Sequence, residues 1–117
     1  MLKIYVGYDR REDAAFNVAV HSLRNGASQS LDITPLKLEK LEGVGLLRRP
    51  REVYGNTMWD TISNAAMSTE FAISRFLSPL LAQTGWALFL DSDVVSLGDI
   101  CGIMSYADPK YAVCKDD

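Results

Sequence analysis

The segment WALFLDSD, residues 86–93, constrains the fold more strongly than any other part of the chain. Residues 86–90 are all apolar, whereas a strand with one face in water alternates apolar and polar side chains. The run therefore predicts a central strand of a parallel sheet, covered by helices on both faces. Two carboxylates, Asp91 and Asp93, follow at its carboxyl end, which is the end where open parallel sheets bind ligands.

Strand and helix patterns alternate along the rest of the chain. β-Branched and aromatic residues predict strands at residues 2–8, 31–38 and 110–114. Pro35 lacks an amide donor, so its strand is expected at a sheet edge. Apolar spacing predicts one helix through residues 16–23, another at 68–82 and a short helix or turn at 97–106. The prediction is an α/β fold, a Rossmann-like, mostly parallel sheet flanked by helices, in one domain spanning residues 1–117.

The helix predicted at residues 68–82 carries both an apolar stripe and an arginine. Its apolar residues recur at intervals of three and four and are expected to be buried together: Ile73, Phe76, Leu77, Leu80 and Leu81. At roughly 100° per residue, Arg75 points away from that stripe. Pro79 is expected to bend or shorten the last turn.

Residues 39–67 hold no sustained period and include Gly43, Gly45, Pro50 and Gly55. They are predicted to form a long irregular loop, which is either a lid or binding loop or simply mobile. Trp59 within it is interpreted as a packing residue.

Composition and charge bear on the partners and the location of the protein. The chain has a formal net charge of -3, and its basic residues are scattered apart from a short cluster at 48–51, so no nucleic-acid partner is predicted. The absence of a basic leader and of an apolar run of about 18 residues favours a cytoplasmic location. Cys101 and Cys114 lie in apolar contexts and are expected to be reduced thiols in the core.

Asp91 and Asp93 are candidates for a divalent-metal site. Both carboxylates can turn toward one cation at a strand-to-loop junction, and hard oxygen ligands suit Mg²⁺ or Mn²⁺ together with substrate phosphates. Two like charges beside the end of a buried strand are unfavourable unless a cation or donors neutralise them. The alternative is that these residues only cap the turn, because Asp and Ser are frequent after strands.

Two long segments resemble the donor-binding region of GT-A-fold glycosyltransferases, close to family 8 and related bacterial sugar transferases. One is STEFAISRFLSPLLAQTGWALFLDSDVVSLGDI, residues 68–100, which presents a helix with an arginine, an apolar strand and Asp-x-Asp. The other is KIYVGYDRREDAAFNVAVHSL, residues 3–23, which resembles the first strand and helix of that family. The resemblance implies a glycosyltransferase that moves a sugar from a nucleotide donor, with a UDP-sugar as the first expectation, to an unknown glycan, lipid or protein acceptor.

The resemblance also implies roles for individual residues. Gly7, Tyr8 and Asp9 would line the pocket for the base and ribose, and Ser92 would belong to the same donor site. Arg75 would reach the diphosphate, and Asp91 would touch both ribose and metal. Asp93 would be the main ligand of Mn²⁺ or Mg²⁺, and Arg75 and Asp93 would form the catalytic pair.

The sequence departs from this family in one respect. Family 8 enzymes complete the metal site with a histidine from a later segment, and none follows Asp93 here. The expectation is therefore the donor-binding half of a longer enzyme, in which binding survives and catalysis is in doubt. Such a half would expose a sheet edge, which favours a homo-oligomer formed through that edge.

Two other functions fit parts of the sequence. LFLDSDVV also resembles the nucleophile motif of haloacid dehalogenase-type phosphatases, in which Asp91 would attack phosphorus and Asp93 would serve as acid or base. That motif usually lies on the first strand, whereas here it comes late. The third reading is a nucleotide-binding module without catalytic activity.

Overall fold

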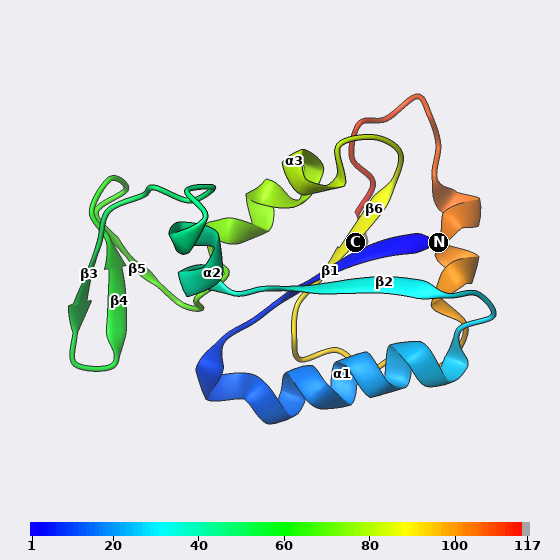
Figure 1. The fold of residues 1–117 in the computed structure, drawn as a ribbon, viewed down its shortest axis with the longest axis horizontal. Helices are drawn as coiled ribbons and strands as arrows, with labels where there is room; N and C mark the ends of the chain where they lie inside the picture. The colour runs from blue at the N-terminus through cyan, green and yellow to red at the C-terminus, as the bar shows by residue number, and fades with distance from the viewer. Residues whose placement is uncertain (116–117) are drawn as a thin grey trace.

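The computed structural model describes residues 1–115, and Figure 1 shows their arrangement. Residues 116 and 117, which belong to the predicted domain, lie outside the described residues. The elements in chain order are β1 (Leu2–Gly7), η1 (Arg10–Glu12), α1 (Asp13–Gly26), β2 (Leu31–Leu36), α2 (Leu38–Gly43), β3 (Arg51–Tyr54), β4 (Thr57–Asp60), β5 (Ala65–Met67), η2 (Ser74–Leu77), α3 (Ser78–Ala82), β6 (Ala87–Leu90) and η3 (Ile100–Tyr106), where η marks a 3₁₀ helix.

The main sheet has three parallel strands in the order β2-β1-β6. The predicted Rossmann-like α/β fold with a parallel sheet and flanking helices is confirmed, as is the edge position of the strand that contains Pro35. The prediction that residues 86–90 form the central strand is wrong for the described sheet. The central strand is β1, which is buried along most of its length, whereas β6 lies at an edge and each of its residues is half-buried.

Both faces of the sheet are covered, which explains why β6 lacks polar residues. On one face, Ile4 and Val6 pack with Leu23 of α1, and the same cluster includes Leu88 and Leu90 of β6. On the other face, Tyr5 packs with Leu36, Leu41 and Ala82, and Ala87 and Phe89 join them. Figure 1 shows α1 and α3 on opposite sides of the sheet. The apolar run is therefore shared between two layers, as period-two geometry requires.

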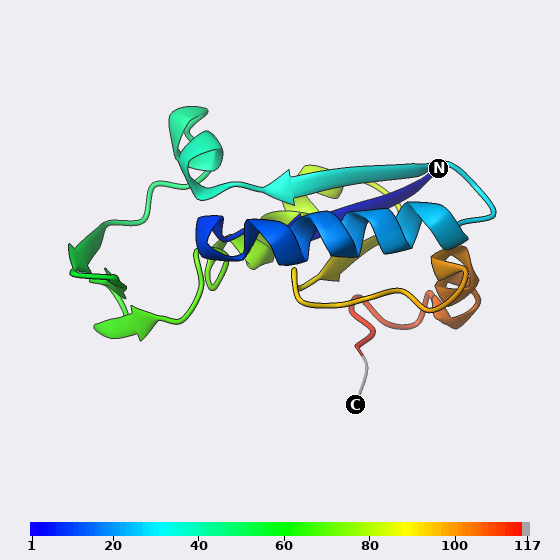
Figure 2. The same cartoon turned by 90° about the horizontal axis from the view of Figure 1, so that it is seen from below.

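Residues 39–67 are not an irregular loop. They complete α2 and then form a second sheet, antiparallel and ordered β3-β4-β5. Gly55 and Asn64, both with positive φ, lie in the two turns of this sheet. We call residues 51–67 the arm, because Figures 1 and 2 show these strands projecting beyond α2, away from the parallel sheet.

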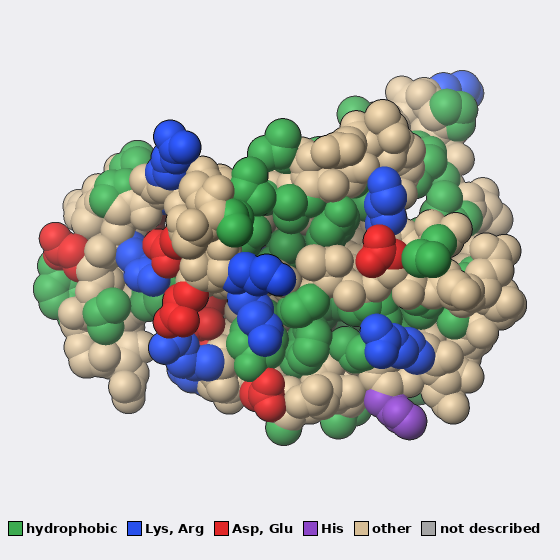
Figure 3. All heavy atoms as spheres, in the orientation of Figure 1, with side chains coloured by type: hydrophobic (Ala, Val, Ile, Leu, Met, Phe, Trp, Pro, Cys, Tyr) green, Lys and Arg blue, Asp and Glu red, His purple; other side chains and the backbone are tan. Residues whose placement is uncertain are grey.

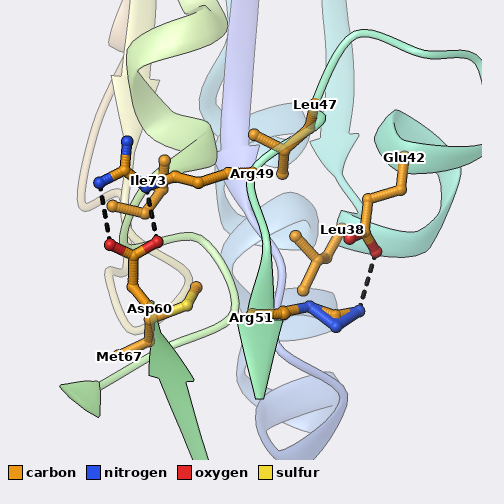
Figure 4. Close-up of a pocket in the computed structure, with 8 residues that line it drawn as sticks. All are labelled: Leu38, Glu42, Leu47, Arg49, Arg51, Asp60, Met67 and Ile73. Atoms are coloured by element: carbon orange, nitrogen blue, oxygen red, sulfur yellow. Dashed lines mark hydrogen bonds and ion pairs between the residues drawn. The ribbon is translucent and has the colours of Figure 1, made fainter. Parts of the chain in front are cut away.

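Ion pairs link the arm to the body, by which we mean the parallel sheet and the segments packed on it, and to the loop before β3. Arg51 of β3 donates to Glu42 of α2 at 2.8 Å, and Asp60 of β4 accepts two hydrogen bonds from Arg49, at 2.6 and 2.8 Å. Figure 4 shows both ion pairs. Arg49 and the amide and hydroxyl of Ser63 hold the pKa of Asp60 well below its ordinary value. Charged contacts with Glu42 and Arg49 thus join the arm to the preceding segment of the chain.

The single helix predicted at residues 68–82 is wrong. The chain makes turns, then η2, then the short helix α3, and Pro79 is the second residue of α3. A proline at that position starts a helix well because its missing amide needs no partner there. The predicted buried stripe is also broken, since the side chains of Phe76 and Leu80 are 75% and 60% exposed.

The chain after β6 differs from prediction in part. A 3₁₀ helix, η3, lies within the predicted helix or turn at 97–106, but residues 110–114 form no strand. Both cysteines are free, and the predicted core position is wrong for Cys114, which is exposed, while Cys101 is half-buried. No helix formed by residues 1–115 combines the length and the hydropathy of a membrane span.

Candidate functional site

The carboxyl ends of β1 and β6 meet at one edge of the parallel sheet. Val6 is paired with Leu90 in the β1–β6 register, so the chain leaves both strands at the same level. Residues 8–12 follow the first strand and residues 91–93 follow the other. The structure therefore brings the two predicted halves of the donor site together, at the edge where the ligands of such sheets bind.

Arg75 is held over two aromatic rings beside Asp91. Its guanidinium carbon lies 5.4 Å from the ring centre of Phe71 and 5.6 Å from that of Phe89. One terminal nitrogen is 4.0 Å from a carboxylate oxygen of Asp91, and Nε donates to the Phe71 carbonyl at 3.4 Å. Cation–π contacts with two rings restrict the guanidinium, which favours its fork-like binding of carboxylate or phosphate oxygens.

The side chains of the Asp-Ser-Asp turn alternate between outside and inside. Asp91 and Asp93 are exposed, whereas Ser92 between them is 1% exposed. The Ser92 hydroxyl donates to the Glu12 carboxylate at 3.0 Å, which ties the turn to η1. Both predicted metal ligands thus face solvent while the residue between them anchors the turn.

Asp9 is the most constrained of the predicted donor-binding residues. Its buried carboxylate accepts from Nε and Nη2 of Arg11 at 3.0 and 2.6 Å, from the Arg11 amide at 2.9 Å and from the Glu70 amide at 3.1 Å. The Arg11 guanidinium and these two amides lower the pKa of Asp9 to about 2. Its oxygens are already committed to donors of the protein, so Asp9 shapes the loop rather than offering a free acceptor to a ribose.

Gly7 and Tyr8 also have partners within the fold. A Cβ atom at Gly7 would lie 2.5 Å from the ring of Phe71, so glycine is needed here for close packing. The Tyr8 hydroxyl donates to Asp13 at 2.7 Å, and this hydrogen bond raises the pKa of Tyr8. The Tyr8 ring packs edge-on against Phe16 and has the Lys37 ammonium 4.8 Å from its centre.

Acidic side chains outnumber basic ones at this edge. The contacts above and the Arg10 pairs bring together Asp9, Glu12, Asp13, Glu39, Glu70 and Asp91 with Arg10, Arg11, Lys37 and Arg75, and Asp93 follows Ser92 in the same turn as Asp91. Figure 3 shows acidic and basic side chains gathered between the arm and the body. An anionic ligand approaching this edge would be repelled unless a cation came with it.

The donor set fits a hard divalent cation that takes few protein ligands. Among residues 1–115 there is no group of three or more His, Cys, Asp or Glu side chains that could hold a metal ion. Asp91 and Asp93 offer two exposed carboxylates in one turn of the chain, and Mg²⁺ is commonly bound by one or two carboxylates plus waters and phosphate oxygens. A closed metal cage of the kind that zinc prefers does not match these residues.

Sequence reasoning missed three residues of this edge: Glu12, Phe71 and Phe89. Glu12 contacts Ser92 across 80 residues of sequence, which no local pattern reveals. The two rings, whose centres are 6.3 Å apart, come from segments that the sequence assigned to separate elements. Helical spacing could not predict the contacts of Arg75 with these rings, because residues 68–82 do not form one regular helix.

A small cavity lies elsewhere, at the base of the arm. Its lining, shown in Figure 4, consists of Leu38, Glu42, Leu47, Arg49, Arg51, Asp60, Met67 and Ile73. Its volume is about 10 Å³, close to that of one water molecule and far too small for a nucleotide. None of the predicted donor-binding residues lines it.

No family model and no solved structure matches the chain. Among curated proteins, it is similar to a protein of Arabidopsis thaliana named Protein CDI, with 39% identity over 112 residues. The match covers 95% of this chain and 39% of that relative, so the chain spans about two fifths of the length of the curated protein that it matches.

Proposed function

We propose that this chain binds the nucleotide-sugar donor of a glycosyltransferase through a divalent cation held by Asp91 and Asp93. The observation that carries the proposal is the position of the Arg75 guanidinium, in cation–π contact with Phe71 and Phe89 and 4.0 Å from Asp91, at the carboxyl edge of parallel strands. The sugar-transfer part of the proposal depends on the sequence resemblance. The residues themselves support a site for a metal and a diphosphate.

Each residue has a distinct task in this proposal. Asp91 and Asp93 hold Mn²⁺ or Mg²⁺, and the cation supplies Lewis-acid neutralisation of the diphosphate. Arg75 donates hydrogen bonds to phosphate oxygens and stabilises the negative charge that grows on the leaving nucleoside diphosphate. The excess of carboxylates at the edge makes the cation a condition of binding, because the diphosphate alone meets repulsion.

Isothermal titration calorimetry tests the proposal. UDP, GDP, ADP and CDP are titrated into the protein with Mn²⁺ and with EDTA in its place, with UDP expected to bind most tightly. Asp93→Ala is expected to weaken binding in Mn²⁺ about 10-fold or more, since ligand loss removes one of two protein contacts to the cation. Asp32→Asn, an exposed acid on β2, is the control and is expected to bind like the wild type. Binding that is unchanged in EDTA, or unchanged in Asp93→Ala, would contradict the proposal.

Turnover assays separate this function from the two alternatives. Hydrolysis or transfer of the sugar from a UDP-sugar in Mn²⁺ supports transferase chemistry, and binding without turnover supports a nucleotide-binding module. Hydrolysis of a generic phosphate ester that disappears in Asp91→Asn would instead favour the phosphatase reading.

A further inference from the structure

The segment that follows the candidate metal site is hydrogen-bonded to η1, to α1 and to the turn that follows α1. The Ser92 hydroxyl donates to Glu12. Further along the chain, the amide of Ser96 donates to the Ser22 hydroxyl at 2.9 Å, and Asp99 accepts from the amide of Ser28 at 3.1 Å. Figures 1 and 2 show this segment running beside α1 from β6 toward η3. The Glu12 contact is the first of these fastenings and the one adjacent to both acids.

Glu12 is itself set in place by the loop after β1. Its amide donates to the Asp9 carbonyl at 2.8 Å, while the Asp9 side chain caps η1 through the Arg11 amide. The Asp9 carboxylate is fixed in turn by the Arg11 guanidinium and the Glu70 amide. A chain of hydrogen bonds therefore runs from the segment after the arm, through Asp9 and η1, to the Ser92 hydroxyl.

We propose that Glu12 is a positioning residue for the metal site: by accepting the Ser92 hydroxyl it holds Ser92 inward and keeps Asp91 and Asp93 outward. This inference rests on the proposed function for its metal, but its structural content does not. Ser92 is 1% exposed and lies between two exposed acids. Loss of its hydrogen bond to Glu12 would therefore free the turn that orients the carboxylates of Asp91 and Asp93. Groups that orient ligands in this way commonly change metal affinity about 10-fold or more when removed.

The position of Glu12 must be distinguished from its charge, since a carboxylate near a cation also attracts it through space. Glu12→Gln keeps an oxygen that accepts the Ser92 hydroxyl and removes the charge, whereas Glu12→Ala removes both. A positioning role predicts that Mn²⁺ affinity, measured by electron paramagnetic resonance with UDP present, falls about 10-fold in Glu12→Ala and is largely kept in Glu12→Gln. Equal losses in the two variants would overturn the proposal, because charge alone would account for them.

Ser92→Ala completes a double-mutant cycle. If the two side chains act only through their shared hydrogen bond, Ser92→Ala and the double variant with Glu12→Ala lose the same affinity as Glu12→Ala alone. Additive losses would contradict the inference. Ser22→Ala is the matched control, because it removes a later fastening of the same segment and is expected to leave Mn²⁺ affinity unchanged.

Hydrogen exchange without metal separates failure of this inference from failure of the proposed function. The amides of residues 91–93 are expected to exchange about 10-fold faster in Glu12→Ala than in the wild type or in Ser22→Ala. If Glu12→Ala speeds exchange but the wild type binds no Mn²⁺, the anchoring role of Glu12 stands and the metal-dependent donor site is rejected. Unchanged exchange would overturn the anchoring role whatever the metal result.

Discussion

The backbone of Gly7 lies so close to the ring of Phe71 that a single added carbon would meet the ring at 2.5 Å. This contact joins the end of the central strand to the segment that carries Arg75. We expect Gly7→Ala to lower the free energy of unfolding by about 2 kcal/mol, since overpacking a tight contact forces side chains or backbone to shift. Chemical denaturation measures the loss.

Gly43 provides a matched control for that substitution. It is the last residue of α2, and nothing lies within 4 Å of the position that its Cβ would occupy. Gly43→Ala is expected to be neutral or to stabilise the protein by up to about 1 kcal/mol, because alanine restricts the unfolded chain more than glycine does. Equal effects of the two substitutions would show that the Phe71 contact is unimportant.

Arg75→Lys keeps the positive charge but loses the planar guanidinium that lies over the rings of Phe71 and Phe89. We expect affinity for UDP in the presence of Mn²⁺ to fall about 10-fold, equivalent to about 1.4 kcal/mol, because an ammonium cannot reproduce the forked contact. Calorimetry gives the affinity, and Arg24→Lys, at the distant end of α1, serves as the control. An affinity equal to that of the wild type would remove Arg75 from the binding site.

Acid should destabilise the protein in a way that depends on Asp9. The pKa of this carboxylate falls from 3.8 to about 2 on folding, so its contribution to stability is complete above its unfolded pKa and is lost as the pH falls toward 2. Asp9→Asn removes the charge and places an amide NH₂ group against the N–H donors of Arg11 and Glu70. We expect the free energy of unfolding to fall by about 3 kcal/mol at neutral pH.

Urea denaturation at a series of pH values checks this expectation. The variant should lose less stability than the wild type between about pH 4 and pH 2, since the titrating group has been removed. Parallel pH profiles for the two proteins would mean that Asp9 does not have the depressed pKa that its hydrogen bonds produce.

Glu42 of α2 is paired with Arg51 of the arm, whose side chain is 23% exposed. Glu42→Ala leaves that guanidinium without its carboxylate and is expected to cost about 1 kcal/mol. Hydrogen exchange should accelerate in β3, β4 and β5 while β1 stays protected. Glu39→Ala on the same helix removes a far more exposed pair with Arg10 and should leave the arm unchanged.

The sequence was a good guide to strands whose apolar residues follow the period of the parallel sheet. Residues 2–7 and 31–36 form strands close to the predicted boundaries, and Pro35 correctly indicated an edge. The place of residues 86–90 in the strand order could not be predicted. An all-apolar run indicates that both faces of the strand are packed, but it does not indicate whether the strand pairs with one neighbouring strand or with two. In β6 both faces are packed and only one side is paired within residues 1–115.

The arm was missed although one local signal was present. Gly55 and Asn56 separate two short strand segments, which is a common hairpin pattern. The strands themselves have three or four residues and too few alternations to stand out from a loop. The Glu12–Ser92 and Arg75–Phe89 contacts were beyond prediction for a different reason, since they depend on how distant segments pack.

The hairpin turn at Gly55 and Asn56 lies at the tip of the arm, in residues that are exposed and outside the parallel sheet. Such a turn tolerates added length, because the entropy of closing a loop rises only slowly with the number of residues. An affinity tag or a fluorescent label inserted there would report on the protein in a cell without touching the edge where β1 and β6 end.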